Sequence, residues 1–537
     1  MAKKTVVSPL PAQHLTVYLL HDGVKPSQAL TKDRLTDSLD SKASILPAGK
    51  LYYTSERADN AKWRKFLEPA FGSKLAPFMS QHPSAVLFIT VSSRTFAIPF
   101  GFGHTLINAA KVVSDFGLMT ALKVADVDTL RAVNYRTIDD RSRVGRIQVS
   151  EDADVEDFQL DTDTDLLRGV EAKSKDLSVC EGVAAGWSSI RVRTRTDAAG
   201  VPSLLSKLLN VYVTGKLPKR FEWIQNIRRI ENKGDIQKRD ALLLKSLNAG
   251  NFNGIRLALP EVVGIGDEMD ARFQGRNGPA FTSDISQFMQ LPHVHSPIDV
   301  PMLTASHVNL RDPTSGNTTQ TYSIYRCIVA EFTDGNEMYL LNDGDWYRVD
   351  QDYAKKLDRA LKKIPLYTHS FPVAGAKTEG AWNEDIAKNA LNKCVLLDKS
   401  NIPFGGGRSK IEPCDLLTSK REWIHAKRRD TSSAGLCHLV SQAFGSSKLL
   451  HRDFLFRKLT AQAIMAASFG DPSIKKVLAK KLKSTQFNPA QWQVVLMILG
   501  GDRTNPATEL PFLAKINIRK QLEEIGNMGF KTAIAVA

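Results

Sequence analysis

The residues that could carry chemistry gather in one stretch near the C-terminus, residues 408–450. An apolar-alternating run ends in Asp415, a polar turn follows, and a second run carries His425 and Lys427. Two adjacent strands of a hairpin bring such residues side by side. A carboxylate, an imidazole and an ammonium could then surround one phosphate, which is what metal-dependent phosphodiester hydrolysis needs.

Metal-assisted hydrolysis gives each of these residues a role. The metal polarises the phosphoryl oxygen and lowers the pKa of the attacking water, and Mg²⁺ takes only one or two protein carboxylates as ligands. Asp415 is the expected first ligand, and Glu384 is the expected second ligand or hydrogen-bonds a metal-bound water. Lys427 would orient the water and offset charge on the phosphate. The sequence therefore predicts catalytic residues Asp415, Lys427, His425 and Glu384, metal ligands Asp415 and Glu384, and Mg²⁺ or Mn²⁺ as the cofactor.

Neighbouring side chains are candidates for contact with nucleic acid. The predicted contacts are Arg428, Arg429, Lys410 and Gln442. Glu412 is a weaker candidate for the site because it would point to the opposite face of a regular strand from Asp415. Each residue also has a structural explanation: Asp415 could cap a turn, His425 could be a hydrogen-bonded sheet residue, and Gln442 could be a surface helix position. Only their joint placement favours a site.

The elements that must position these residues follow in a regular order. Apolar periodicity predicts helices at 381–391 and 436–450, strands at 394–397, 410–417, 422–428 and 492–499, and a glycine turn at 405–407. This α-β-β-β-α-β order resembles the core of the PD-(D/E)xK restriction-endonuclease-like nucleases. The resemblance implies an acidic residue two positions before the lysine. This chain has His425 there, and imidazole suits Mn²⁺ better than Mg²⁺.

Ahead of this region the chain reads as two further domains. Residues 1–200 predict an N-terminal α+β domain, and residues 201–364 predict a helical connector followed by a β-rich middle region. Residues 365–537 form the nuclease-like domain, so the expected fold class is mixed α/β. Gly101 and Gly103 follow a predicted strand without the rest of a nucleotide fingerprint, which favours a tight turn. The acidic run 151–165 lacks the glycine of an EF-hand loop, which favours a solvated loop.

Charge and cysteine content narrow the partners and the compartment. The 537 residues carry a formal charge of +15, which attracts polyanions, so DNA is the expected partner and RNA the alternative. The five cysteines include no CxxC pair, which argues against a disulfide framework or a thiolate zinc site. A reducing cytoplasm fits this content. The N-terminus has no signal-peptide pattern and no apolar run is long enough to span a bilayer, so neither secretion nor membrane contact is expected.

Rare residue combinations recur along most of the chain. They include FEWIQNI at 221–227, NDGDWYRVDQDY at 342–353, WIHAKRR at 423–429 and LPFLAKINIRKQLEEIGNMGF at 510–530. In these groups the chain resembles a family of uncharacterised bacterial proteins of sporadic distribution. The resemblance implies carriage on mobile or defence-associated loci, and with it restriction of phage or foreign DNA, a defence-system partner or a homo-oligomer. It supplies no activity.

Three functional hypotheses follow. The first is a metal-dependent nuclease that cuts foreign DNA. The second is a non-catalytic nucleic-acid-binding or regulatory protein that keeps a degenerate nuclease fold, with salt-sensitive binding and no cleavage. The third places a nucleotide-dependent activity near Gly101 and His104. The joint placement of Asp415, His425 and Lys427 favours the nuclease hypothesis.

Overall fold

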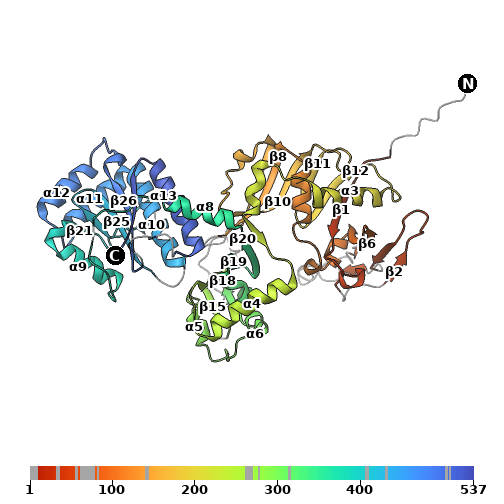
Figure 1. Ribbon diagram of the computed structural model, residues 1–537, viewed down its shortest axis with the longest axis horizontal. Coiled ribbons are helices and arrows are strands. Elements are labelled where there is room, and N and C mark those ends of the chain that lie inside the picture. The colour runs from red at the N-terminus through yellow and green to blue at the C-terminus, as the bar shows by residue number, and fades with distance from the viewer. Residues whose placement is uncertain are drawn as a thin grey trace, which may run out of the picture. The chain divides into compact units, whose positions relative to one another are not determined.

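The computed structural model describes residues 10–31, 37–54, 58–60, 79–81, 84–138, 144–260, 270–275, 278–312, 316–369, 371–404, 410–429, 433–501, 503, 506 and 510–537. The chain divides into a first compact unit, Met1–Thr137 with Val144–Ile224, and a second, Ile138–Arg143 with Gln225–Ala537. Both contain helices and mostly antiparallel sheets, so the chain is a mixed α/β protein (Figure 1). Among the described residues, no helix is long and apolar enough to cross a bilayer.

The first unit is built on a ten-stranded antiparallel sheet. Its spatial order is β2 (Asp37–Asp40), β3 (Gly49–Tyr53), β6 (Ser84–Val91), β7 (Arg94–Gly101), β1 (Gln13–Leu19), β12 (Ser189–Thr194), β11 (Val183–Gly186), β10 (Asp165–Ser174), β8 (Ala125–Thr137) and β9 (Val144–Ala153). A separate two-stranded sheet pairs β4 (Ala58–Asn60) with β5 (Met79–Gln81). The β6–β7 hairpin turns at Ser92 and Ser93, both at positive φ.

Two helices cover the core of this sheet. In β1, alternation buries Leu15, Val17 and Leu19, and each fully buried side chain of this size contributes about 2 kcal/mol. α2 (Phe116–Val124) lies so close to the sheet that a Cβ on Gly117 would sit 1.9 Å from the Ser189 carbonyl oxygen. α3 (Val201–Thr214) buries its leucine face in the same core, so the contacts join residues 201–224 to the N-terminal sheet.

The Gly101–Gly103 segment forms a close-packed turn. Gly101 adopts φ +57° at the end of β7, and Gly103 begins a short 3₁₀ helix, Gly103–Leu106. A Cβ on Gly103 would lie 2.0 Å from the Ala85 carbonyl oxygen. Close backbone packing therefore explains this glycine.

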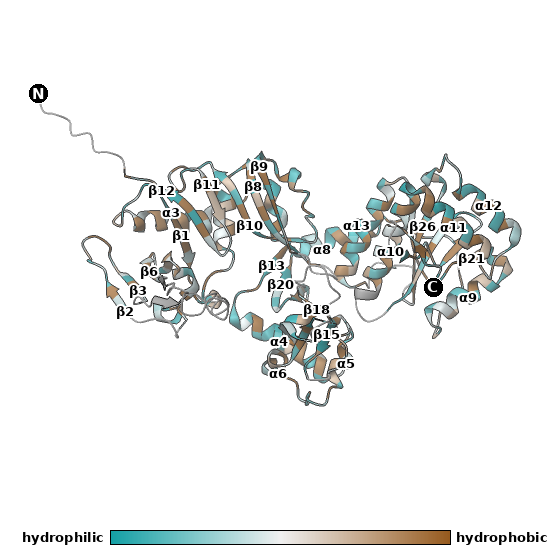
Figure 2. Cartoon of the chain, turned by 180° about the vertical axis from the view of Figure 1, so that it is seen from behind, coloured by the Kyte–Doolittle hydropathy of each residue, from teal (hydrophilic) through white to brown (hydrophobic). Residues whose placement is uncertain are grey.

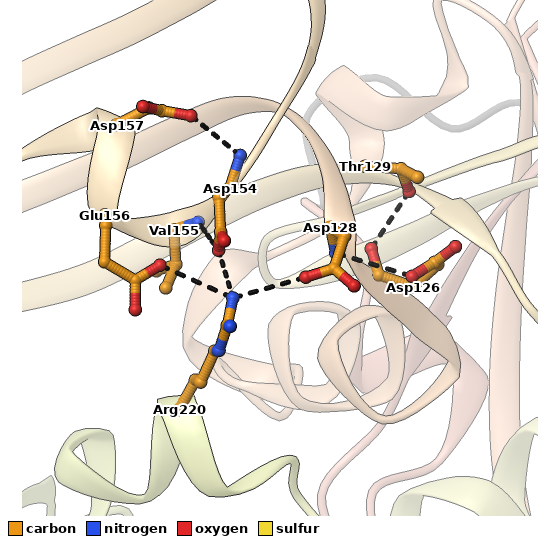
Figure 3. Close-up of polar contacts among 8 residues, drawn as sticks. All are labelled: Asp126, Asp128, Thr129, Asp154, Val155, Glu156, Asp157 and Arg220. Atoms are coloured by element: carbon orange, nitrogen blue, oxygen red, sulfur yellow. Dashed lines mark hydrogen bonds and ion pairs between the residues drawn. The ribbon is translucent and has the colours of Figure 1, made fainter.

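Basic side chains pair with some of the carboxylates of the acidic run 151–165 in the first unit. Asp152 pairs with Arg131 at 3.0 Å and with Lys173. Arg220 contacts Asp154, and its Nη1 lies 3.2 Å from Asp128 and 3.4 Å from Glu156 (Figure 3). The solvated loop favoured by the sequence is only partly what the structure has: the run includes the end of β9, the 3₁₀ helix Val155–Phe158 and the start of β10.

The middle of the chain contributes two sheets to the second unit. The five-stranded sheet has the order β13 (Ile227–Arg229), β20 (Asp345–Val349), β19 (Glu337–Asn342), β18 (Ile328–Asp334) and β14 (Ile255–Leu257). The three-stranded sheet has the order β15 (Asp270–Phe273), β16 (His307–Arg311) and β17 (Thr318–Ser323). The helices around them are α4 (Lys233–Asn248), α5 (Ile285–Met289), α6 (Val300–Ala305), α7 (Ile324–Cys327) and α8 (Gln351–Leu361).

The C-terminal sheet of the second unit has five strands. Their order is β21 (Cys394–Leu396), β24 (Leu416–Thr418), β25 (Glu422–Arg428), β26 (Gln493–Leu499) and β27 (Lys531–Val536), and the last two pairings are parallel. A parallel pairing needs a crossover, which here contains α10 (Ser433–Arg452), α11 (Phe454–Ala466) and α12 (Pro472–Leu482) before β26, and α13 (Phe512–Asn527) before β27. Figure 2 colours β26 brown and much of α12 teal, consistent with their burial.

Helices cover both faces of this sheet. α9 (Glu379–Lys388) buries Trp382 and Ile386 in one core with Ile424 and Ala426 of β25. α10 packs on β25 and β26, and its Ser446 approaches His425, whose side chain points to the other face. The ends of β21, β24 and β25 therefore lie between two helical layers.

One predicted strand is wrong in a way that matters for the site. The sequence predicts a continuous strand at 410–417, whereas the structure has β23 (Lys410–Ile411), an irregular segment at 412–415, and β24 from Leu416. Pro413 has no N–H for a sheet ladder and explains the break. The strand predicted at 422–428 matches β25. The glycine turn at 405–407 lies outside the described residues.

Candidate metal centre

Three carboxylates meet at the edge of the C-terminal sheet. One oxygen from each of Asp398, Glu412 and Asp415 lies within 4.8 Å of the others. Asp398 follows β21, and the other two belong to the irregular segment before β24. Among the described residues they form the one group of three such side chains with a metal-binding geometry. Oxygen ligands at this spacing suit a hard divalent cation such as Mg²⁺ or Mn²⁺.

The backbone fixes Asp415 between two neighbours. Its carbonyl accepts hydrogen bonds from the amides of Leu397 (2.8 Å) and Asp398 (3.1 Å), and its own N–H donates to the Ile424 carbonyl (3.0 Å). Its carboxylate accepts from the Ala426 N–H at 2.7 Å and lies 3.5 Å from the Asn383 amide nitrogen. Asp415 is 3% exposed, so water scarcely hydrates its carboxylate. These contacts hold the carboxylate in place instead.

Glu412 is held from two other elements. The Gln442 amide on α10 donates to its carboxylate at 2.8 Å, and the backbone N–H of Lys399 donates to its other oxygen. The irregular backbone at 412–415 breaks strict alternation, so Glu412 and Asp415 come together although a regular strand would place them on opposite faces. The expectation that Glu412 points away from Asp415 is therefore wrong.

A lysine and a fourth carboxylate lie beside this group. Lys427, at the end of β25, pairs with Glu379 at 3.1 Å. Glu379 stands in the first turn of α9, whose N-cap is Thr378. Its negative charge contributes to the pKa shifts of both Asp415 and Glu412.

The carboxylates are held in an environment that disfavours their charge. Burial raises the pKa of Asp415 well above its usual range; the Ala426 N–H opposes this, and the charges of Glu412, Glu379 and Asp398 add to it. Burial also raises the pKa of Glu412. Within the part of the chain that the structure describes, no lysine or arginine side chain pairs with Asp398, Glu412 or Asp415. A bound divalent cation would remove this penalty.

The other predicted catalytic residues lie elsewhere. His425 is completely buried, its Nε2 is 3.4 Å from the Ser446 hydroxyl, and burial lowers its pKa to about 3. It is a neutral side chain under α10. Glu384 pairs with Lys388 at 2.9 Å along α9 and lines a cavity beside Asp398. Of the residues that the sequence predicts to be catalytic or metal-binding, the group of three carboxylates contains Asp415 but neither Glu384 nor His425.

The predicted nucleic-acid contacts also differ in their surroundings. Arg428 donates to the carbonyls of Gly375 and Lys377, both at 2.6 Å, which ties β25 to the segment before α9. Lys410 is exposed on β23, and Arg429 is half-buried with its N–H bonded to the Leu499 carbonyl. Gln442 orients Glu412 rather than standing apart from the carboxylates.

Sequence reasoning missed Asp398 and Glu379. Asp398 had a usable signal, because it directly follows an apolar strand, as a ligand at a sheet edge does. Glu379 had a weaker signal, two residues before the start of the predicted helix at 381–391. α9 begins at Glu379 because the Thr378 hydroxyl accepts a hydrogen bond from the Ala381 N–H.

These features define a mixed α/β protein whose C-terminal sheet carries a group of three carboxylates that could hold a divalent cation. A family described as "Family of unknown function (DUF6119)" matches residues 15–537, so the chain belongs to that family. Searches of curated proteins and of solved structures gave no match.

Proposed function

We propose that this protein is a metal-dependent nuclease that hydrolyses phosphodiester bonds of DNA. The observation that carries the proposal is the convergence of Asp398, Glu412 and Asp415 within 4.8 Å, with no basic side chain neutralising them in the described structure. Such a group is costly unless a cation binds it. Foreign or phage DNA as the target, and a role in defence, stay predictions.

The order of the surrounding elements supports this proposal. Helix α9, strands β21, β24 and β25, helix α10 and strand β26 occur in the order α-β-β-β-α-β, with β22 (Ile402–Pro403) and β23 between β21 and β24, and with α11 and α12 between α10 and β26. The first three strands are antiparallel and the fourth is parallel to its neighbour. This is the arrangement expected of a restriction-endonuclease-like core, whose metal ligands sit where the central strands end. Fold alone does not establish activity, so the proposal depends on the carboxylates.

The chain's own residues divide the work. Asp398, Glu412 and Asp415 would hold the divalent cation, which supplies polarisation of the phosphoryl oxygen and a more acidic water. Lys427 is kept near this group by Glu379 and offers a positive charge to a phosphate oxygen. Gln442 and Ala426 hold two of the carboxylates in position. Neutral His425, on the far face of β25, supports the sheet rather than the reaction.

Lysines on α12 offer a place for the DNA backbone. Lys476 and Lys480 on α12 and Lys483 at its C-cap are exposed and lie at helical spacing along one face. α12 packs on α11, which lines the cavity beside Asp398. Phosphate contacts by such side chains add salt-dependent affinity without sequence preference.

The direct test is cleavage of linear and circular DNA by the full-length protein in Mg²⁺ and in Mn²⁺. We expect wild type to cut, Asp398→Asn to fail, and Glu384→Gln on the cavity wall to retain cleavage. Cleavage that survives Asp398→Asn but is lost in Glu384→Gln would instead support Asp415 and Glu384 as the metal ligands, as the sequence predicts. Salt-sensitive DNA binding without cleavage in either metal would instead favour the binding-protein hypothesis.

The α12 lysines allow a separate binding test. Changing Lys476, Lys480 and Lys483 together to Gln should weaken DNA binding and reduce its salt slope by about three. The matched control changes three exposed lysines of α8 and its C-cap to Gln, Lys355, Lys356 and Lys362, because α8 is not among the described helices that pack on α11. An equal loss in both variants would show that net charge, rather than α12, attracts DNA.

A further inference from the structure

A cavity opens beside the carboxylates. Its volume is about 970 Å³, at the upper end of the roughly 300–1,000 Å³ of small-molecule sites. Three segments line it: the start of α9, the chain from Leu396 to Ile402 after β21, and the end of α11 with the residues that follow to Phe469. These elements meet in the C-terminal part of the second unit (α9, β21 and α11 in Figure 1). We infer that this cavity receives the base of an unpaired nucleotide, so that the substrate is single-stranded DNA.

The cavity and the candidate metal centre share residues. Asp398 belongs to the carboxylate group and also lines the cavity, and so does Glu379, the partner of Lys427. A phosphodiester held at the carboxylates would therefore have one of its flanking nucleosides at the cavity mouth. The inference rests on the proposed function in this respect, because it uses the same carboxylates to fix the phosphate.

The charge of the cavity favours a base over a phosphate chain. Glu379, Glu384 and Asp398 line it with one lysine, Lys399. Glu379 and Glu384 are ion-paired with Lys427 and Lys388, so Asp398 is the carboxylate there without a basic partner in the described structure. A chain of phosphates would meet repulsion there. A nucleobase is neutral, and its amino groups can donate hydrogen bonds to carboxylates, as the cytosine amine does to Glu or Asp. The side chains of Ser400 and Asn401 add further polar contacts.

The apolar part of the cavity suits a flat aromatic ligand. Phe469, Leu396 and Ile402 line it. Phe469 is half-buried against the sheet core, and the Lys388 ammonium lies 5.5 Å from its ring centroid, where a base would displace it. Stacking of a base on an aromatic ring is favourable for every base, which predicts binding without strong sequence preference. Small residues of α11, Ala463 and Ala466, leave room beside the ring.

A base in duplex DNA reaches such a cavity only after it leaves the stack. Unstacking and unpairing disfavour the duplex, whereas a single strand presents its bases already unpaired. The expected preference is cleavage of a single strand at least about tenfold faster than a perfect duplex of the same sequence. A duplex with one unpaired nucleotide should be cut next to that nucleotide.

The test compares these three substrates with the full-length protein in Mn²⁺. Ala466→Trp places a large ring at the cavity mouth, and Met465→Trp, an exposed position of the same helix that does not line the cavity, is its matched control. Phe469→Leu removes the stacking surface by an independent change. We expect Ala466→Trp and Phe469→Leu to slow cleavage of the single strand about tenfold. Met465→Trp should cut as wild type does, and the Mn²⁺-induced thermal stabilisation should be unchanged in all three variants.

A second measurement separates this inference from the proposed function. Binding of a labelled single strand is followed by fluorescence anisotropy with Ca²⁺ in place of Mn²⁺. If wild type cuts no DNA but Ala466→Trp still weakens single-strand binding, the nuclease proposal falls and the base site stands. If wild type cuts single strand and duplex equally, and neither variant changes cleavage or binding, the base site is overturned and the nuclease proposal stands. If Ala466→Trp also loses the Mn²⁺-induced thermal stabilisation, the effect of Phe469→Leu on single-strand cleavage and binding decides whether the base site stands.

Discussion

The two compact units each hold a group of carboxylates, and the groups differ in how their charge is met. In the first unit, Asp152 is exposed to water and its pKa is lowered by hydrogen bonds from Lys173 and Arg131. In the second, burial raises the pKa of Asp415, and its acidic neighbours raise it further. Acidic residues are dense in both stretches of sequence. Their partners and their burial, not their number, distinguish a satisfied surface from a site that attracts a cation.

Arg220 makes the difference concrete. Its guanidinium contacts Asp154, Asp128 and Glu156 together (Figure 3). The pKa of Asp154 is lowered by its hydrogen bond with Glu156 and then by Arg220. At the C-terminal sheet, by contrast, the Lys427 ammonium is bound to Glu379, and no lysine or arginine of the described structure pairs with Asp415. Four predictions test whether this contrast decides function.

The largest effect is expected from removal of charge at the buried group. Asp415→Asn keeps an oxygen that can accept from the Ala426 N–H, but it loses the carboxylate. DNA cleavage should fall about 1,000-fold, or about 4 kcal/mol in activation free energy. The matched change Asp152→Asn in the first unit should leave cleavage unaltered. Equal losses in the two variants would abolish the distinction between the groups.

The pH dependence of stability should run in opposite directions in the two units. A carboxyl group whose pKa is raised in the folded state contributes stability below its unfolded-state pKa, and this contribution is lost as pH rises. Asp415, Glu412 and Glu331 are such groups. Loss of hydration raises the pKa of Glu331 from 4.5 to about 7, so between these values its contribution of about 3 kcal/mol is lost. A carboxyl group whose pKa is lowered, such as Asp152, contributes stability above its unfolded-state pKa, and this contribution is lost as pH falls.

Hydrogen exchange of the metal-free protein, corrected for intrinsic rates, measures this contrast. Peptides from β18 and β25 should lose protection from pH 5 to pH 8, and the loss in β18 should be smaller in Glu331→Gln. Peptides from β10 should lose protection below pH 4. Parallel behaviour of both units across the whole range would contradict the assignment of opposite shifts.

A smaller effect is expected where a positioning contact is lost. Gln442→Leu removes the 2.8 Å hydrogen bond to Glu412 and keeps a side chain of similar size on α10. Outer hydrogen bonds of this kind are worth about tenfold or more in metal affinity. Titration of Mn²⁺ against thermal stability should show that loss, with the midpoint without metal little changed. An unaltered Mn²⁺ midpoint would mean that Gln442 does not position the ligand.

The smallest effect is expected from Arg220→Gln in the first unit. It removes the shared cation from Asp128, Asp154 and Glu156 without burying any of them. These carboxylates remain hydrated, so the variant should gain no Mn²⁺-induced stabilisation of β8 and β9 by hydrogen exchange. A new Mn²⁺ response there would show that unpaired acidic charge alone creates a cation site in this protein.

Part of the candidate site could be predicted from sequence because local patterns determine it. The alternation of β25 fixed its bounds at 422–428, and the turn before it placed Asp415 beside Ala426. His425 and Lys427 are two residues apart and were expected on one face. Lys427 stands at the strand end, where its long side chain reaches Glu379, whereas α10 closes over His425. That closure depends on a helix formed later in the chain.

The sequence by itself determined the mixed α/β class and the strand at 422–428, because periodicity and turn residues act over short distances. Only the tertiary structure decided which acids meet. Asp398 and Glu412 reach Asp415 through an irregular segment held by the amides of Leu397, Asp398 and Lys399, contacts that no local pattern encodes. It also decided charge: burial sets the pKa of Asp415, and burial is a property of the packed chain.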